Sequence, residues 1–421
     1  MLKDGDFERV KEGVEIGAYA SEVLILKPKG TNLIGLCPFH NEKTGSFVVS
    51  KAKQIYKCFG CNSSGDVIRL AQHIERLPNA TLAAKSLAAR YNIEVTEIFL
   101  NQDDDLLAPS LEEIFVANKK AQEFFQKSFF DNKPIKRIIY ERGYKTKEEV
   151  IKWGIGYAPS SYSLPIDKDV QVRAGLLTKL GDSNLFRDRI MFPIKDAMGN
   201  IVGFGGRINN GSGPKYINTP DTMAFNKSET LYGLHQAKKA IKANNEFVLT
   251  EGYTDVASLH RVEIETSIAT MGTSITKAQV DILTKLSRKG FIMTDSDKAG
   301  LAAAARALPL FWENGVDISV LSLPNGEDAD SMVRQHGHNV IGEIVNTDGI
   351  RFLYGFNLNQ LKSEELAVIE TLKAVSKCML KLRRQTLAKQ LAGVSGYSLS
   401  AIMEELNKIT AKALYRKTLL G

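Results

Sequence analysis

Short apolar runs alternate with longer amphipathic stretches across residues 246–350. The apolar runs predict four strands, at 247–249, 268–271, 291–293 and 318–323. The stretches between them predict three helices, at 255–261, 276–287 and 299–313. The last of these is rich in alanine, the strongest helix former. Because strands that alternate with helices favour a parallel sheet with helices on both faces, we expect a compact α/β unit here.

The pattern outside this unit predicts smaller elements. Short apolar runs at 47–49 and 55–56 predict strands of a small ribbon, and 66–91 has the spacing of a helical tail. Leucine and isoleucine recur at helical intervals through 361–421, which predicts a helical bundle. The run Lys381–Arg384 is expected to be a solvated basic face of that bundle.

These elements predict an α+β chain of several domains. The segment 101–110 is polar and acidic and ends in Pro-Ser, so it is the expected linker. The domains on either side are expected to be an N-terminal module at 1–100, a basic mixed α/β subdomain at 111–245, the α/β unit at 246–350 and a helical subdomain at 351–421.

Charge is distributed unevenly along the 421 residues. The formal net charge is +7, but 246–360 has a net charge of −6 whereas 151–245 and 361–421 each have +6. An acidic block between two basic blocks fits a metal-bearing core flanked by surfaces for nucleic acid, although solubility alone also explains so modest an excess. With no apolar stretch of about 18 residues and a charged start, the protein is expected in the cytosol and off the membrane.

Carboxylates follow the predicted strands of the α/β unit. Glu251 ends one apolar run, and Asp295 and Asp297 end another. Asp328 and Asp330, in LPNGEDAD, come after the last run. Because the carboxyl ends of parallel strands share one edge, the acids should meet there. Each acid taken alone could be only a helix cap or a turn residue. Two aspartates at i and i+2, however, can face the same crevice. A site made of carboxylates alone suits Mg²⁺ or Mn²⁺, the metals that nucleotidyl transfer uses.

Three of the four cysteines cluster near the N-terminus. Cys37 and His40 form one pair and Cys58 and Cys61 another, each pair with two residues between its members. Two such pairs separated by a loop can close a tetrahedral Cys₃His zinc site, which leaves no open position and is therefore expected to be structural. A redox CxxC with an incidental upstream cysteine is the alternative.

The block 151–245 contains a predicted hairpin followed by a glycine-rich loop. The runs 190–194 and 201–204 flank Met198-Gly199-Asn200, a turn sequence. Gly205 and Gly206 are expected to let the backbone approach a ligand closely.

Cations follow these glycines. Arg207, Lys215 and Lys227 can contact phosphates of a nucleotide triphosphate or of a template backbone. A plain hairpin explains the glycines equally well, so the acids just downstream are what favour a nucleotide site.

Several motifs together resemble the bacterial DnaG-type primases over essentially the whole chain. CPFHNEKTGSF and CFGCNSSGD resemble the family's zinc-binding domain. YERGYKT, WGIGYAP, RIMFPIKDAMGNIVGFGGR, PKYINTP and LYGL resemble its polymerase domain. EGYTDV, MGTS, DSDKAG and LPNGEDAD resemble its Toprim metal centre, in the same order along the chain.

The resemblance implies template-directed synthesis of short RNA primers from rNTPs on single-stranded DNA, with an RNA–DNA hybrid as product. It implies that Glu251, Asp295 and Asp297 bind catalytic Mg²⁺ or Mn²⁺. Asp328 and Asp330 would be supporting acids, Arg142, Arg207, Lys215 and Lys227 would handle phosphates, and Cys37, His40, Cys58 and Cys61 would bind one structural Zn²⁺.

The sequence also departs from the family. Gln279 stands where the family often has histidine, and the segment 361–421 is too short to be the further domain that docks on the replicative helicase, the expected partner. A Toprim topoisomerase or nuclease is one alternative, but no tyrosine lies in a recognisable DNA-cleaving motif. A non-catalytic zinc-bearing DNA-binding protein is the other, and it would not need three acids at strand ends.

Overall fold

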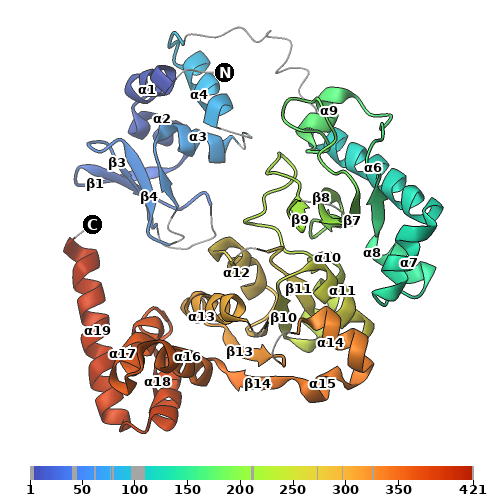
Figure 1. Cartoon of the computed structure of the whole chain (residues 1–421). Coiled ribbons are helices and arrows are strands. Elements are labelled where there is room, and N and C mark those ends of the chain that lie inside the picture. The colour runs from blue at the N-terminus through green and yellow to red at the C-terminus, as the bar shows by residue number, and fades with distance from the viewer. Residues whose placement is uncertain are drawn as a thin grey trace. The chain divides into compact units, whose positions relative to one another are not determined.

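The computed structural model describes residues 4–39, 45–60, 63–75, 77, 80–95, 110–209, 213–272, 274–295, 297–324 and 327–419. The chain divides into two compact units, Met1–Ala108 and Pro109–Gly421 (Figure 1). The division lies in the expected linker 101–110, of which 101–109 are outside the described residues. In the part of the chain that is described, no helix is both long and apolar enough to cross a bilayer.

The first unit is a small antiparallel sheet packed against helices. Its elements are α1 (Asp4–Gly13), α2 (Ile16–Val23), β1 (Leu26–Lys29), β2 (Asn32–Gly35), β3 (Phe47–Ser50), β4 (Ile55–Cys58), β5 (Ser64–Gly65), α3 (Val67–Ile74) and α4 (Ala80–Arg90). The strands follow one another in order across the sheet. The predicted strands of the ribbon are confirmed as β3 and β4.

The helical tail predicted at 66–91 is two helices rather than one. α3 ends at Ile74 and α4 begins at Ala80. The sequence has a proline at position 78, and the residue before a proline is disfavoured in helical backbone. Both helices bury one apolar face, for example Leu70 and Leu87, in the core of this unit.

The second unit begins with a helical layer on an antiparallel sheet. Its elements are α6 (Leu111–Asp131), α7 (Lys133–Glu141), α8 (Lys147–Trp153), β6 (Gly156–Ala158), α9 (Lys168–Arg173), β7 (Arg189–Lys195), β8 (Ile201–Ile208) and β9 (Tyr216–Asn218). The sheet order is β6-β7-β8-β9. The hairpin prediction is confirmed: β7 pairs with β8, and the Asp196 carboxylate accepts from three backbone N–H groups of the turn, including that of Gly199.

The predicted role of the two glycines in this sheet is wrong. Gly205 and Gly206 lie inside β8 and not in a loop. A Cβ at Gly205 would lie 2.4 Å from the ring of Tyr253, and one at Gly206 would lie 2.7 Å from the ring of Phe186. The glycines therefore make room for buried aromatic rings rather than for a ligand.

The α/β unit predicted at 246–350 follows, and the helix before its predicted start, Leu234–Asn244, packs in the same core. Its elements are α10 (Leu234–Asn244), β10 (Phe247–Thr250), α11 (Tyr253–Arg261), β11 (Ser267–Ala269), α12 (Lys277–Thr284), β12 (Lys289–Thr294), α13 (Lys298–Glu313), β13 (Asp317–Ser322), α14 (Ala329–His336), α15 (Val340–Glu343) and β14 (Val345–Asp348). Side chains alternate between two apolar layers: Leu249 and Ile292 pack with α13, whereas Val248 and Met293 pack with α11 and α14. Helices therefore cover both faces, as predicted.

The sheet is mixed rather than purely parallel. Its order is β11-β10-β12-β13-β14, and the four strands β10 to β13 are parallel as predicted. β14 pairs antiparallel with β13 at one edge. Its sequence, VNTD, is short and partly exposed, so it carries none of the apolar signal that identified the central strands.

The C-terminal segment is helical, as predicted. It comprises α16 (Gly349–Leu361), α17 (Glu364–Val375), α18 (Lys381–Ser395) and α19 (Leu399–Leu419). The predicted solvated basic face is wrong in part, since Arg383 pairs with Asp317 and Arg384 donates to the Cys378 carbonyl. These two arginines fasten α18 to the preceding structure.

Candidate active site

Four carboxylates lie at the carboxyl edge of the parallel strands. Glu251 follows β10, Asp295 follows β12, Asp297 is the N-cap of α13 and Asp328 is the N-cap of α14. We call these four residues the acid edge. The crossover connections place them there because each parallel strand ends on the same side of the sheet.

The acids influence one another electrostatically. Burial raises the pKa of Glu251, and the charges of Asp295 and Asp297 raise it further. Burial also raises the pKa of Asp295, with Asp328 and Asp297 adding to the effect. Mutual repulsion of this kind is what carboxylates brought together without cations produce. The strand ends and helix N-caps place these four acids at one edge, as predicted from the sequence, and the mutual effects on pKa agree with this placement.

One carboxylate oxygen of the acid edge lacks a partner within the described part of the chain. Glu251 Oε1 is buried and has no hydrogen-bond partner among the described residues. No group of three or more histidine, cysteine, aspartate or glutamate side chains forms a preassembled metal site within the described ranges. The donor set fits a hard cation that is held by a few carboxylates and completed by water and substrate phosphates, which is how Mg²⁺ usually binds.

Gly300 is part of the geometry of this edge. Its N–H donates to Asp297 Oδ1 at 2.7 Å. A Cβ at Gly300 would lie 2.4 Å from the Asp295 carbonyl oxygen and 3.1 Å from Glu251 Oε1. Glycine in DSDKAG therefore lets the first turn of α13 approach both acids.

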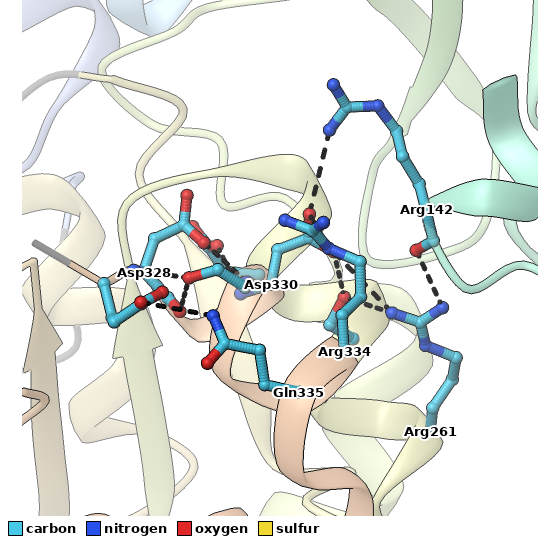
Figure 2. Close-up of polar contacts among 10 residues, drawn as sticks. Arg142, Arg261, Asp328, Asp330, Arg334 and Gln335 are labelled. Carbon is cyan, nitrogen blue, oxygen red and sulfur yellow. Dashed lines mark hydrogen bonds and ion pairs between the residues drawn. The ribbon is translucent and has the colours of Figure 1, made fainter.

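Asp330 has a different environment. Its side chain is 3% exposed, and Ser258 Oγ donates to Oδ1 at 2.6 Å. Arg261 lies 3.6 Å from Oδ1, while Arg334 and Arg142 lie 3.3 Å and 3.9 Å from Oδ2 (Figure 2). The structure thus brings Asp330 to arginines, and its predicted role with magnesium stays a prediction.

The two predicted arginines lie near each other. Arg142 is the C-cap of α7, and Arg207 lies in β8 with its guanidinium 5.7 Å from the centre of the Tyr216 ring. Burial lowers the pKa of Arg142, and the charge of Arg207 lowers it further. Two cations this close indicate a place where an anion would be favoured.

The two predicted lysines lie in different places: Lys215 is close to the acid edge, and Lys227 is close to β9. The positive charge of Lys215 partly offsets the raised pKa of Asp295. Lys227 Nζ lies 3.1 Å from the side-chain amide of Asn218, placed to donate to its oxygen. The Asn218 amide also meets the Tyr253 hydroxyl.

Sequence reasoning missed Asp255. This residue is buried and accepts from the N–H groups of Gly252 and Asp330, at 3.0 Å and 3.3 Å. Burial raises its pKa to about 8, with help from the charges of Asp328 and Asp295. The available signal was only an acid in the first turn of a helix, within EGYTDV, and the sequence of that helix, YTDVASLHR, does not show that nearly all of it is buried.

Arg261 and Arg334 were also missed. Each lies in the last turn of a short helix, a position where a basic residue is ordinarily explained by the helix dipole. Gln279, the departure from the family pattern, is buried and donates to the carbonyls of Lys227 and Thr230. It therefore fixes the loop that carries Lys227.

Two of the four predicted zinc ligands lie at one end of the small sheet in the first unit. Gly35 of β2 pairs with Phe47 of β3, and Phe47 pairs with Cys58 of β4. Cys37, two residues beyond Gly35, therefore leaves the sheet at the same end as Cys58. Both cysteines are buried.

The turn after β4 is held in place by Ser46. Its hydroxyl lies 3.1 Å from Cys58 Sγ and accepts from the Gly60 N–H. His40 and Cys61, the other two predicted ligands, lie outside the described residues.

Models of three families match the chain. The CHC2 zinc finger matches residues 2–102. The N-terminal domain of the DNA primase catalytic core matches residues 124–238. The Toprim-like family matches residues 248–333, which include the whole acid edge.

Characterised proteins match over most of the chain. The DNA primase of Geobacillus stearothermophilus is 36% identical over 435 residues, which cover 97% of this chain and 72% of that protein. The zinc-binding and RNA polymerase domains of Aquifex aeolicus primase are 30% identical, cover 95% of this chain and 99% of that one, and superpose with a TM-score of 0.61. A DnaG primase catalytic domain bound to single-stranded DNA is 27% identical, with a TM-score of 0.60 over 69% of this chain and 98% of that one.

Proposed function

This chain belongs to the bacterial DnaG-type DNA primases, and from that premise we propose how its residues divide the work of primer synthesis. As a primase-type RNA polymerase, it is a nucleotidyltransferase that makes RNA primers for DNA replication. The proposal concerns its substrates and the residues that bind them.

The acid edge would hold the divalent metal of the Toprim unit. Glu251, Asp295 and Asp297 would be its primary ligands, with Asp328 in support. The observation that carries this assignment is the buried Glu251 Oε1, which lacks a hydrogen-bond partner within the described structure and lies beside two further carboxylates. When bound, Mg²⁺ or Mn²⁺ would supply charge stabilisation to the reacting phosphates and to the departing pyrophosphate.

The basic residues would bind the substrates. Lys215, which lies close enough to the acid edge to act on Asp295, would contact the phosphates of an incoming rNTP. Arg142 and Arg207, near each other on the antiparallel half of this unit, would contact the backbone of a single-stranded DNA template. Lys227, fixed through Gln279 and Asn218, would contact the RNA–DNA hybrid or the rNTP.

The first unit would recognise the template. Its match to the CHC2 zinc finger supports bound Zn²⁺, and Cys37, His40, Cys58 and Cys61 would be the ligands. A closed four-ligand site contributes folding energy and rigidity rather than chemistry. The replicative helicase is the protein partner that we propose, on family membership alone.

The test of the metal assignment is primer synthesis by acid-edge variants. Asp295→Ala or Asp297→Ala is expected to reduce rNTP incorporation on a defined single-stranded template by about 10³-fold or more, because a metal ligand is lost. Binding of the same template without divalent metal should change less than about twofold, since phosphate contacts come from other residues.

Asp281→Ala is the matched control, because Asp281 lies on α12 in the same sheet unit and its charge is not among those that raise the pKa of Glu251 or Asp295. It should leave both measurements unchanged. Primer synthesis by the Asp295→Ala, Asp297→Ala double variant would show that the metal lies elsewhere.

A further inference from the structure

Asp330 is surrounded by more positive charge than it can neutralise. Three guanidinium groups, those of Arg142, Arg261 and Arg334, approach its single carboxylate within 4.0 Å. The two oxygens are divided among them, and Ser258 Oγ also donates to Oδ1. Because arginine stays protonated in proteins, the cluster has an excess of two positive charges.

Arg261 is the structural member of this cluster. Its side chain is 13% exposed, and its guanidinium donates to the Arg142 carbonyl at 3.2 Å and to Ser258 Oγ at 2.5 Å. It also lies 4.8 Å from the centre of the Tyr144 ring. A Cβ at Gly143 would lie 2.3 Å from Arg261 Nη1, so the glycine of RGY makes room for this contact. Arg261 therefore joins α11 to the turn after α7.

Arg142 and Arg334 are the members that reach solvent. Their side chains are 28% and 37% exposed, against 3% for Asp330. Each guanidinium has five N–H donors, and the carboxylate between them can occupy only some of these. Figure 2 shows the two side chains coming from different elements, the turn after α7 and the helix α14, toward the same carboxylate.

This arrangement favours an anion over a cation. A divalent metal on Asp330 would lie next to three guanidinium groups, whereas a phosphate would meet unused donors and an excess of positive charge. The charges of Arg207 and Arg334 both lower the pKa of Arg142, because nearby like charges disfavour its protonated form.

We propose that Asp330 is a positioning residue for phosphate recognition, holding Arg142 and Arg334 as a pair that binds one phosphate group, with Arg334 as its unassigned member. This role replaces the magnesium role expected for Asp330 from sequence. It rests on the proposed function for the phosphate source, which is either the template strand or the triphosphate of the rNTP.

The experiment compares Arg334→Ala, Arg334→Lys and Asp330→Asn in the full chain. Binding of fluorescent single-stranded DNA is measured in EDTA at several salt concentrations, the KM for rNTP is measured in primer synthesis, and binding of Mn²⁺ is measured directly. Arg351→Ala is the matched control, since Arg351 lies in the same unit with a 68% exposed side chain.

If the phosphate belongs to the template, Arg334→Ala should weaken DNA binding about tenfold and reduce the slope of log affinity against log salt by about 0.7. If it belongs to the rNTP, the KM for rNTP should rise about tenfold with DNA binding unchanged. In either case Arg334→Lys should recover only part of the loss, Asp330→Asn should move the same parameter, and Mn²⁺ binding should be unaffected.

Two results would overturn the proposal. One is an Arg334→Ala protein with wild-type DNA binding, salt slope and rNTP KM. The other is an Asp330→Asn protein that loses Mn²⁺ and keeps both phosphate affinities. If Asp330→Asn does not fold, the two Arg334 variants decide the question alone, because the Arg334 side chain is 37% exposed and its replacement is compatible with folding. Activity of the Asp295→Ala enzyme would instead contradict the metal assignment and leave these binding results standing.

Discussion

Two Asp-x-Asp pairs follow the neighbouring strands β12 and β13, and the first aspartate of one pair and the last aspartate of the other, Asp295 and Asp330, lie in opposite electrostatic environments. In the first pair, Asp295 precedes the helix and Asp297 is the N-cap of α13. In the second, Asp328 is the N-cap of α14 and Asp330 lies inside its first turn. Asp295 is repelled by other carboxylates, whereas Asp330 is buried among arginines.

The difference shows that the position of each acid relative to the helix cap decides its surroundings. Asp297 and Asp328 are equivalent caps, and both remain at the strand edge. Asp295 lies two positions before its cap and stays at the end of the strand. Asp330 lies two positions after its cap, inside the first turn of α14, where its side chain faces Ser258 of α11. Equal spacing in sequence therefore gives one pair suited to a cation and one aspartate suited to holding cationic side chains.

The largest loss of primer synthesis among these variants is expected from Gly300→Ala, which tests whether the positions of Asp295 and Asp297 depend on a glycine in the first turn of α13. The new Cβ would meet the backbone oxygen of Asp295 at 2.4 Å, which only a shift of α13 or of the acid can relieve. Because displacements of about 1 Å at a reacting centre can cost about 100-fold, primer synthesis should fall by roughly that factor.

Gly355→Ala in α16 is the control, because a Cβ there meets nothing within 4 Å. It should keep full activity and unfold at a slightly higher temperature, since alanine is the better helix former by about 1 kcal/mol. A Gly300→Ala enzyme within twofold of wild type would mean that the acid edge tolerates displacement.

A smaller effect, on the pH dependence of stability, is expected from Asp255→Asn. Asp255 is relevant to the comparison because acids of both pairs, Asp295, Asp328 and Asp330, act on it. Its pKa of about 8 is far above its ordinary value, so the folded state favours the protonated acid. The stability gained from protonation is fully present below the ordinary pKa and is lost as pH rises through the folded-state value. Between pH 6 and pH 8 the wild type should lose about 2 kcal/mol of unfolding free energy from this group, and the asparagine variant should not.

Urea denaturation in EDTA at pH 6, 7 and 8 measures this difference. Glu251 and Asp295 also have raised pKa values, so the quantity to compare is the difference between variant and wild type at each pH. Parallel pH profiles for the two proteins would show that Asp255 ionises normally in the fold.

The central sheet of the second unit could be predicted from sequence because its strands are buried on both faces. Runs such as 247–249 and 291–293 are apolar throughout, and the helices between them have one apolar stripe. The edge strand β14 was not predictable, since VNTD lacks that signal. No element before the ribbon strands was predicted, and the strands β1 and β2 were missed for the same reason: β1 is almost wholly exposed, and β2 is only partly buried.

The candidate site was predictable where a residue follows a buried strand. Glu251 and Asp295 were identified in this way, and the structure brings them together. The network around Asp330 was not predictable, because Arg142 and Arg261 are distant in sequence and meet only through the packing of α11 against the turn after α7. The role of Gly205 was predicted wrongly because the sequence alone does not distinguish a glycine that makes room for a neighbouring ring from one that makes room for a ligand.

The smallest effect is expected from variants of Asp328, which caps α14 and is proposed to support the metal. These variants test whether the second pair contributes to metal binding as the first pair is proposed to do. Asp328 Oδ1 accepts from the Ser331 N–H at 2.7 Å. Asp328→Ala should lose this cap and about 1 kcal/mol of stability, whereas Asp328→Ser should keep the cap. If Asp328 also supports the metal, both variants should lose about tenfold in primer synthesis and need more Mg²⁺, because serine restores the cap but not the charge.

Asp348 provides the matched cap, because it accepts from the Arg351 N–H at 2.9 Å and pairs with Ser319, near the start of β13 and away from the carboxyl edge. Its alanine and serine variants should differ in stability in the same way and keep normal primer synthesis. Should Asp328→Ser restore activity together with stability, Asp328 would be a cap alone. The acid edge would then consist of Glu251 and the first pair, and the second pair would contribute no metal ligand.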